Sequence, residues 1–268
     1  MKEILIVVPA HNEEQNIRRC LYTLSSLTVP EDCMVKIAVV LDRCTDRTAA
    51  IVKSMPSRFW VASFEKTVYG PCVSHGSNNF EFALKQTCFG DYIVRCDADV
   101  QNIPSNALEL LLPHLNDEVR RVSGECKSRT DKWYWNLLFW LAELNARITP
   151  LGEEPRGAVC MFERRTVQEI GGFHRSSWSW DTGFDVLIKQ HGWKVMKVKE
   201  LVVTSKRKTS LKGIIRRQIL SGKARRSLNA SFKRTLLHSI FRGRIFVLYG
   251  YLTETYSEFT NIREVGPT

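Results

Sequence analysis

The stretch ILIVVPAHNEEQNIRRCLYTL, residues 4–24, decides the fold class. It opens with five consecutive apolar residues, Ile4–Val8, passes through a polar loop, and then places apolar residues from Ile17 to Leu24 at steps of three and four. A short apolar run rich in β-branched residues is typical of a buried strand, whereas steps of three and four indicate a helix. The stretch therefore predicts a strand, a loop and a helix.

The same unit recurs along the first half of the chain. Two more apolar runs, Val35–Leu41 and Asp91–Cys96, predict buried strands. The helical patterns that alternate with them lie at 49–52, 78–90 and 105–115. This alternation predicts an α/β protein with a mainly parallel sheet and helices on both faces.

Composition agrees with that class. The chain has 268 residues, of which 44% are hydrophobic and 25% charged, as in ordinary soluble globular proteins. The apolar run at the N-terminus is too short for a secretory signal, and no apolar stretch reaches the ~20 residues of a membrane helix. We expect a cytoplasmic protein with free cysteines, located either in solution or peripherally at the inner face of the membrane.

Polar residues follow each predicted strand directly. They form three clusters: His11 to Glu13, Asp42 with Asp46, and Asp97 with Asp99. Ligands of such sheets bind in the crevice beyond the carboxyl ends of the strands. Two carboxylates one residue apart suit Mg²⁺ or Mn²⁺ when a substrate diphosphate supplies further oxygens. On its own, this D-x-D pattern is weak evidence for a metal site, because a solvated loop or a helix-capping Asp more often accounts for it.

Five blocks, taken together, carry a family resemblance: VVPAHNEEQNIRRCLYTL, VVLDRCTDRT, GDYIVRCDADV, GAVCMFERRTVQEIGGFH and SWDTGFDVLIKQHGWKV. In order and spacing the chain resembles the family 2 glycosyltransferases with the GT-A fold, over roughly residues 1–208. The resemblance implies an inverting, metal-assisted transfer of a sugar from a nucleoside diphosphate sugar, UDP- or GDP-linked, to a hydroxyl of a glycan or lipid-linked acceptor. It also implies a catalytic domain over 1–205, with a nucleotide-binding half (1–115) and an acceptor half (116–205), followed by a basic, helical segment over 206–268.

The resemblance also assigns site residues. The base and ribose pocket and the donor site fall on Pro9, Ala10, Asn12, Glu13, Asp42, Asp97 and Ala98. Asp97 and Asp99 match the metal-binding acids, which implies Mn²⁺ or Mg²⁺ as the cofactor. Asp181 matches the catalytic base, although it also fits an N-cap of the helix that follows.

This sequence departs from the family pattern at three places. Trp180 stands where relatives carry an acid, Asn78 and Asn79 stand where many carry Arg-Asn, and Ser205 stands where some carry a metal-binding His. Further contacts to acceptor or phosphate are expected at Gly157, Trp180, Lys206, Arg207, Arg216 and Arg217.

The net charge of +11 is concentrated near the C-terminus. Residues 201–253 contain 13 Lys or Arg and no Asp or Glu, while the rest of the chain carries 26 basic and 28 acidic residues. Such a segment suits an anionic membrane surface, the donor diphosphate or a nucleic acid. Nucleic-acid binding is not expected, because only Phe232 and Phe241 interleave with the charges between residues 201 and 244.

The helix expected over Lys132–Ile148 is apolar nearly all round. Such helices are usually buried, so we expect it in the core or in a dimer contact. The alternatives are an acceptor platform and a lipid-facing groove.

Two other function classes fit parts of the pattern. A sugar nucleotidyltransferase also joins a nucleotide-binding sheet to a carboxylate-held metal, but it needs a Gly-rich basic phosphate loop that PAHNEEQN lacks. A basic nucleic-acid-binding module on a degenerate enzyme core is the second. The nucleotide base, sugar, acceptor and oligomeric state do not follow from the sequence.

Overall fold

A computed structural model describes residues 1–56, 60–67, 74–148, 158–173, 178–206 and 209–254. Its centre is an eight-stranded sheet with the strand order β3-β2-β1-β4-β7-β6-β8-β5. The strands are β1 (Lys2–Ala10), β2 (Cys33–Asp42), β3 (Trp60–Lys66), β4 (Tyr92–Cys96), β5 (Val100–Asn102), β6 (Val119–Arg129), β7 (Val159–Glu163) and β8 (Lys194–Lys206).

Strand directions divide the sheet into two parts. The first part, β3-β2-β1-β4, is parallel throughout. β7 then runs antiparallel to both β4 and β6, whereas β6 and β8 are parallel and β5 is antiparallel to β8. The expected mixed, mainly parallel α/β sheet is therefore confirmed.

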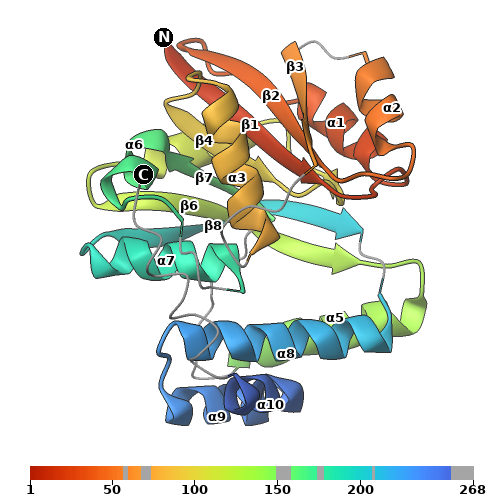
Figure 1. Cartoon of the computed structure of the whole chain (residues 1–268), viewed down its shortest axis with the longest axis vertical. Helices are drawn as coiled ribbons and strands as arrows, with labels where there is room; N and C mark the ends of the chain where they lie inside the picture. Colours follow the sequence, from red (N-terminus) through yellow and green to blue (C-terminus); the bar gives the residue numbers. More distant parts are fainter. Residues whose placement is uncertain (57–59, 68–73, 149–157, 174–177, 207–208, 255–268) are drawn as a thin grey trace.

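Helices cover both faces of the sheet (Figure 1). They are α1 (Ile17–Ser25), α2 (Thr48–Ser54), α3 (His75–Gln86), α4 (Ala107–Leu111) with the 3-10 turn η1 (Leu112–His114), α5 (Trp133–Ile148), α6 (Arg164–Glu169), α7 (Trp180–Gln190), α8 (Leu211–Ser227), α9 (Phe232–Phe241) and α10 (Ile245–Thr253). The core on one face includes residues of α1, α2 and α4, and the core on the other includes residues of α3, α6 and α7.

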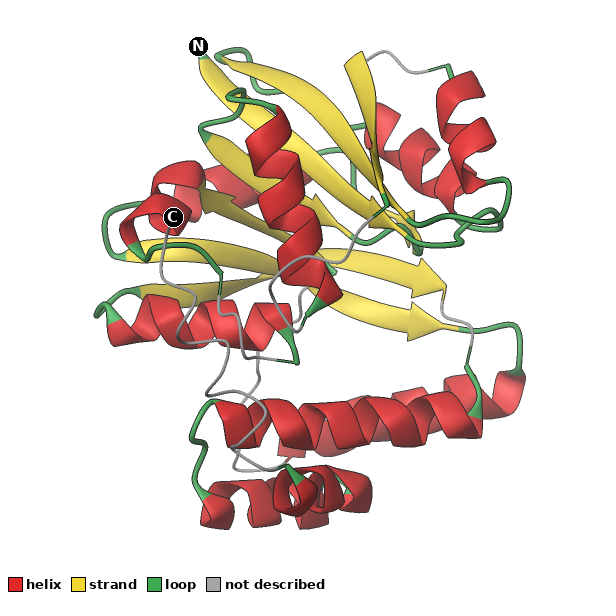
Figure 2. Ribbon diagram, in the orientation of Figure 1, coloured by secondary structure: helices red, strands yellow, loops and turns green. Residues whose placement is uncertain are grey.

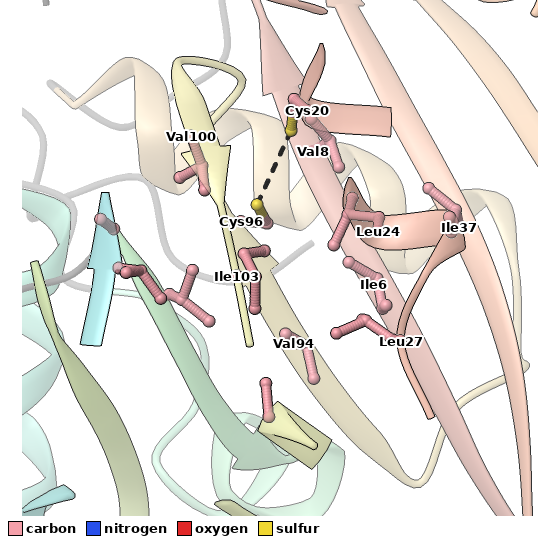
Figure 3. Close-up of a cluster of buried hydrophobic side chains, with 14 of the residues drawn as sticks. Ile6, Val8, Cys20, Leu24, Leu27, Ile37, Val94, Cys96, Val100 and Ile103 are labelled. Carbon is pink, nitrogen blue, oxygen red and sulfur yellow. Dashed lines mark hydrogen bonds between the residues drawn. The ribbon is translucent and has the colours of Figure 1, made fainter. Parts of the chain in front are cut away.

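Alternation along β1 explains the two cores. Ile4, Ile6 and Val8 belong to one core, and Leu5 and Val7 to the other, because successive side chains of a strand point to opposite faces. Figure 3 shows the first core, in which the thiols of Cys20 and Cys96 lie 3.8 Å apart. The seven cysteines in the described ranges are all free thiols, as expected.

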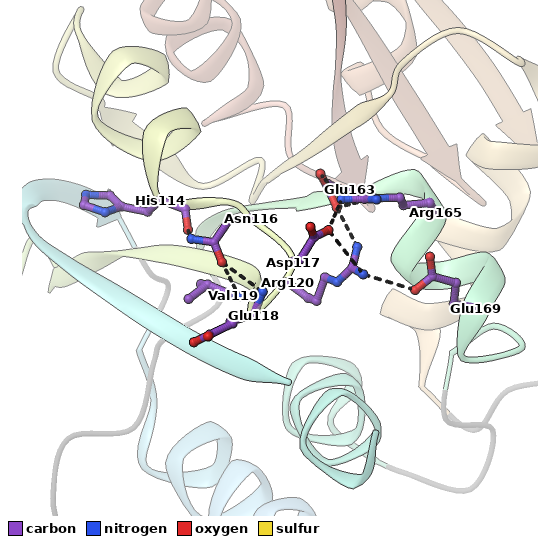
Figure 4. Close-up of polar contacts among 9 residues, drawn as sticks. All are labelled: His114, Asn116, Asp117, Glu118, Val119, Arg120, Glu163, Arg165 and Glu169. Carbon is purple, nitrogen blue, oxygen red and sulfur yellow. Dashed lines mark hydrogen bonds and ion pairs between the residues drawn. The ribbon is translucent and has the colours of Figure 1, made fainter. Parts of the chain in front are cut away.

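An ion-pair network lies at the end of the sheet opposite the three polar clusters (Figure 4). Arg120, at the start of β6, is 6% exposed and pairs with Glu163 at 2.9 Å and with Glu169 at 3.5 Å. Its guanidinium also stacks on Trp193, with 4.7 Å to the ring centroid. Glu163 is paired with Tyr92, the first residue of β4, which places the network at the amino end of that strand.

Below the sheet, α8, α9 and α10 form a separate layer (Figures 1 and 2). The amide of Asn145 in α5 donates to the carbonyl of Phe241 at the end of α9, at 2.6 Å, so α5 joins the same layer. We call α5, α8, α9 and α10 the helical layer. None of the helices in the described part of the chain is long and apolar enough to cross a membrane.

The expectation that the aromatic helix is buried in the core is wrong for this chain. Along α5, Trp133 is 74% exposed and Trp140 58% exposed. The inner side chains, Trp135 and Phe139, are only half-buried. The reason is geometric: α5 lies in a thin layer of helices with one face toward the body of the protein.

Within the helical layer, α8 and α10 touch backbone to backbone at two glycines. A Cβ at Gly222 would lie 2.0 Å from the carbonyl oxygen of Val247, and one at Gly250 would lie 2.1 Å from that of Ile219. Real Cβ atoms do not approach backbone this closely, so any side chain at either position separates the two helices.

Gly222→Ala should therefore destabilise the protein, although alanine is the better helix former. Overpacking typically costs about 1–3 kcal/mol, which exceeds the gain in helix propensity of about 1 kcal/mol. Urea unfolding monitored by circular dichroism measures the difference. Gly213→Ala in the same helix is the matched control, since its Cβ would meet only the Ser210 hydroxyl, at 3.1 Å. Equal stability of the two variants would contradict the close packing.

Candidate active site

The carboxyl ends of β1, β2 and β4 meet at one edge of the sheet. Ala10 pairs with Leu41 at the ends of β1 and β2, and Val7 pairs with Arg95 near the end of β4. The three polar clusters of the sequence leave the sheet there, on adjacent strands, as expected. This edge is the candidate active site.

The loops after β1 and β2 are tied to each other. The side-chain oxygen of Asn12 accepts from the backbone N–H of Thr45 at 2.8 Å, and the N–H of Glu13 donates to the Thr48 hydroxyl at 2.8 Å. Asn12 has φ +54°, in the left-handed region that Asn tolerates better than most residues. Pro9 is half-buried and Ala10 buried at the base of this loop. The two loops therefore form one polar ledge.

Asp42 lies beneath that ledge in a cluster of donors. Its carboxylate accepts from Arg43 Nε at 2.7 Å, Lys66 Nζ at 3.3 Å and Asn79 Nδ2 at 3.2 Å. Burial alone would raise the pKa of this carboxyl, but Arg43, Asn79 and Lys66 outweigh it and lower the pKa to about 2. Asp42 is 1% exposed, so its charge is held inside the protein by these three partners.

The D-x-D acids follow β4 in a tight turn. The N–H of Val100 donates to the Asp97 carbonyl at 3.1 Å, and within this turn Asp97 and Asp99 are half-buried while Ala98 is 4% exposed. The end of β8 is attached to the same turn, because the N–H of Lys206 donates to the Asp99 carbonyl at 2.8 Å.

The turn fits a hard divalent cation through two carboxylates. Aspartate oxygens suit Mg²⁺ and Mn²⁺, which commonly take only one or two protein carboxylates and complete their shell with substrate phosphates and water. Over the described ranges, no group of three or more His, Cys, Asp or Glu could hold a metal. Asp97 and Asp99 are the two carboxylates of this turn that could ligate such a cation.

Arg95 connects the D-x-D turn to the next part of the site. Its guanidinium nitrogen Nη2 lies 2.5 Å from Asp97 Oδ1, and its Cζ lies 4.3 Å from the centroid of the Trp180 ring. It thereby bridges the D-x-D turn and the start of α7. The side chain of Arg95 lies on the face of the sheet that carries Trp180. Its neighbours Val94 and Cys96 point to the opposite face, where they belong to the core that contains α1, α2 and α4.

Asp181 lies in the first turn of α7. Its Oδ1 accepts from the Ser179 hydroxyl and from the N–H of Thr182 at 2.9 Å. Ser179 occupies the N-cap position, but its side chain makes no capping hydrogen bond. The Asp181 carboxylate itself accepts from a backbone N–H of the first turn, so the capping contact that the sequence allowed for Asp181 is present. Burial raises the pKa of Asp181, but Arg95, the Ser179 hydroxyl and Arg121 lower it below the ordinary aspartate value. Arg95, which also pairs with Asp97, therefore connects Asp181 electrostatically to the D-x-D turn and favours its ionised form.

Trp180 lies inside the protein. Its ring is 5% exposed and packs against Phe80 and Phe173, with centroids 4.9 Å and 6.2 Å away. Gly76 makes room for it, since a Cβ there would lie 2.6 Å from the indole. This placement does not support the expectation that Trp180 contacts the acceptor. The ring instead packs the start of α7 against the core, and the Arg95 guanidinium stacks on it.

The remaining expected residues are less informative. Gly157 and Arg207 lie outside the described residues. Lys206 ends β8, where its amine pairs with Asp131 at 2.8 Å. Arg216 and Arg217 are exposed in the first half of α8.

Sequence reasoning missed two cations of this site. Lys66 follows no motif, and only the sheet brings it to Asp42, its register partner between β2 and β3. Arg95 could have been noticed in the sequence, because it is a charge inside the apolar run YIVRC. Burying a charge costs free energy unless the charge is paired, so such a residue indicates a partner.

The comparisons with known proteins agree with this geometry. Residues 5–171 match the model of the family Glycosyl transferase family 2. No curated protein matches the chain in sequence.

Solved structures show the same fold. A mannosyltransferase from Pyrobaculum calidifontis, in complex with GDP-Man and Mn²⁺, superposes with a TM-score of 0.63 at 17% identity, over 100% of this chain and 77% of that one. TarS residues 1–349 from S. aureus, in complex with UDP-GlcNAc, gives 0.59 at 15% identity, over 96% and 77%. Glucosyl-3-phosphoglycerate synthase from Mycobacterium tuberculosis, with Mn²⁺, UDP and phosphoglyceric acid, gives 0.52 at 18% identity, over 87% and 78%.

At these identities the structural likeness establishes the fold alone, and that fold is the GT-A fold that the five sequence blocks implied. The family match extends over more than half of the 268 residues and includes the loops after β1 and β2, the D-x-D turn and β7. The chain belongs to glycosyl transferase family 2.

Proposed function

We propose that this glycosyltransferase moves a sugar from a nucleoside diphosphate sugar, UDP- or GDP-linked, to an acceptor hydroxyl with inversion and with the help of Mn²⁺ or Mg²⁺. The observation that supports it most is the bridge formed by Arg95. This side chain contacts Asp97 of the D-x-D turn and the Trp180 ring, next to the candidate base Asp181. A donor site and a base for the acceptor thus belong to one connected group of side chains.

The roles follow from the chemistry of each group. Asp99 and Asp97 would hold the cation, which neutralises charge on the diphosphate leaving group. Asp181 would accept the proton of the attacking hydroxyl. Its lowered pKa keeps it ionised near neutral pH, at the expense of basicity. In an inverting displacement one base is sufficient, which is consistent with Trp180 standing where relatives carry an acid.

The polar ledge would hold the nucleotide. Pro9, Ala10, Asn12 and Glu13 line the first loop, and the hydrogen bonds between Asn12 and Thr45 fix that loop against the second. Asp42 supports this ledge from beneath, and Ala98 would lie under the donor sugar between the two acids. These assignments rest on the match to the family motif and on the shared edge of the sheet.

The donor and acceptor are the least specified part of the proposal. The neighbouring structures hold GDP-Man, UDP-GlcNAc or UDP with phosphoglyceric acid, so one fold serves different bases, sugars and acceptors. For this chain we propose a glycan or lipid-linked acceptor, used at the inner face of a membrane.

Thermal unfolding with UDP, GDP, CDP and dTDP, each with and without Mn²⁺, tests the donor site. We expect one nucleotide at about 100 times its Kd to raise Tm by about 5–10 °C, and only when the metal is present. Asp99→Ala should abolish the metal-dependent part, because that carboxylate is a proposed ligand. Asp91→Ala, an exposed acid at the amino end of β4, is the matched control and should keep it. A full shift in Asp99→Ala would disprove the metal assignment.

A further inference from the structure

The helix α5 turns an apolar stripe toward solvent. Trp133, Leu137, Trp140 and Leu144 recur at steps of three and four, so they lie on one face, and each is at least 45% exposed. Soluble proteins rarely leave an apolar patch of this kind uncovered, and Trp is costly to expose. The stripe therefore needs a partner outside the described chain.

A second stripe lies in the same helical layer. Ile245, Tyr249 and Leu252 are spaced by four and three residues along α10, and Ile245 is 69% exposed. Exposed Phe241, at the end of α9, precedes α10 and accepts the hydrogen bond from Asn145 of α5. This hydrogen bond joins the end of α9 to α5 one residue after the exposed Leu144, so both stripes belong to one connected layer.

Charge selects the kind of partner. The segment from residue 201 to 253, which contains three of the four helices, carries 13 basic and no acidic residues. Lys233 and Arg234 are exposed in the first turn of α9, one turn from the exposed Leu237. A second copy of this chain would bring like charges together, which disfavours association. Nucleic acid would match the charge but leave the apolar stripes in water.

We propose that the helical layer docks on an anionic lipid bilayer. Helices that lie in a membrane interface combine Trp, Phe and Leu on one side with Lys and Arg on the other, and they bind through buried apolar area plus attraction to anionic lipid. Trp and Tyr are enriched at this depth because their rings are amphipathic. The stripes of α5 and α10 insert between headgroups, and Lys233 and Arg234 contact lipid phosphates.

The docked layer places the active site beside the membrane. Lys206 ends β8, where its N–H donates to the Asp99 carbonyl at 2.8 Å, and its amine pairs with Asp131 just before α5. The connections from β6 to α5 and from β8 to α8 thus leave the sheet next to the D-x-D turn. It follows that the acceptor hydroxyl is presented by a membrane component; this consequence rests on the proposed function, whereas the docking does not.

Co-sedimentation of the full chain with vesicles tests the docking. We expect binding to vesicles of equal parts phosphatidylcholine and phosphatidylglycerol, little binding to pure phosphatidylcholine, and weaker binding as salt is raised. Equal binding to both vesicles, or binding to neither, overturns the proposal. Asp99→Ala should bind vesicles like the unmodified chain, so a failed transferase assignment is distinguishable from failed docking.

The charge arm replaces Lys233 and Arg234 together by Glu. Each basic residue near an anionic surface contributes to the free energy of membrane binding. The loss of two should lower the partition coefficient by at least about 30-fold. This double variant should still fold, because Ser231 caps α9 and Arg234→Glu completes a capping box with it. The matched control is Lys85→Glu with Lys199→Glu, two exposed lysines outside the helical layer, which should retain most binding. Equal losses in both variants would show that only net charge matters and would overturn this surface.

The apolar arm replaces Trp133 and Trp140 by Ser. Vesicle binding should fall by at least tenfold, whereas Tyr22→Ser, an equally exposed aromatic on α1, should leave it unchanged. Light scattering of the same samples identifies the rival partner: a dimer that becomes a monomer in the Trp variant, with unaltered vesicle binding, overturns the proposal. Salt-sensitive binding to duplex DNA with none to vesicles overturns it as well.

Discussion

Asp181→Asn is expected to lower kcat by about 10²- to 10⁴-fold, the usual contribution of a general base. The amide can still accept from the N–H of Thr182 and the Ser179 hydroxyl, so α7 should begin as before. Nucleotide binding, measured by the thermal shift with metal, should be unchanged. Release of nucleoside diphosphate from the donor that the shift identifies, with acceptor present, gives kcat.

The pH dependence of kcat gives a second readout of the same residue. The pKa of Asp181 is lowered against its burial by Arg95, the Ser179 hydroxyl and Arg121, so the acidic limb of the profile should lie below the ordinary aspartate value of 3.8. Arg95→Met removes a cation that favours the carboxylate, and the limb should move to higher pH. A limb that does not move, or an Asp181→Asn variant with normal kcat, would mean that another group takes the proton.

The parallel half of the fold follows from local sequence. Ile4–Val8, Val35–Leu41 and Asp91–Cys96 all contribute residues to both cores, so they are easy to identify as apolar runs in which only Lys36, Asp91 and Arg95 are charged. Because parallel strands end at the same edge, the polar residues that follow them had to meet there. This is why the amino-acid sequence alone is enough to place the D-x-D turn and the first two loops at one edge of the sheet.

The second part of the sheet, β7-β6-β8-β5, could not be predicted from local sequence in this way. β6 reads VRRVSGECKSR, with charges in a strand, and only its pairing between β7 and β8 makes it part of the sheet. Arg121 on β6 is fully buried and paired with Asp185 of α7, a contact over 64 residues that no local pattern encodes. Long-range ion pairs of this kind hold Asp181 and Trp180 in place, so the base could be matched to a motif but its surroundings could not.

The prediction that the aromatic helix α5 is buried in the core fails for a different reason. An all-round apolar pattern indicates that a helix is covered, but it does not say by what. In α5 the half-buried residues, such as Trp135 and Phe139, face the protein, and Trp133 and Trp140 face outward. A sequence rule that equates apolar with interior assumes that the partner belongs to the same chain.

Asp42→Asn is expected to cost about 3–5 kcal/mol of unfolding free energy, the typical loss when one partner of a buried ion pair is removed. Lys66 is 3% exposed and pairs with Asp42 at 3.3 Å. Without that carboxylate, its ammonium stays inside the protein and loses this counter-charge, while Arg43, which shares the same carboxylate, remains a nearby cation. Urea unfolding at neutral pH measures the loss, and a cost below about 1 kcal/mol would contradict the buried pair.

Acid should act on the same group in the unmodified chain. Its pKa is lowered from 3.8 to about 2 on folding, so the unfolded chain binds the proton more readily. The stabilisation, about 2 kcal/mol, is complete above pH 3.8 and is lost as the pH falls through about 2. Asp42→Asn removes this part of the acid dependence altogether.

A double replacement separates charge pairing from packing at Asp42. Asp42→Asn with Lys66→Met removes the stranded ammonium and keeps an unbranched apolar stem in its place, so most of the lost stability should return. Lys66→Met alone should cost less than Asp42→Asn, because the carboxylate keeps Arg43 and Asn79 as donors. If the double variant is as unstable as Asp42→Asn, the carboxylate itself positions the ledge above it, and the nucleotide-induced thermal shift should be reduced in the same variant.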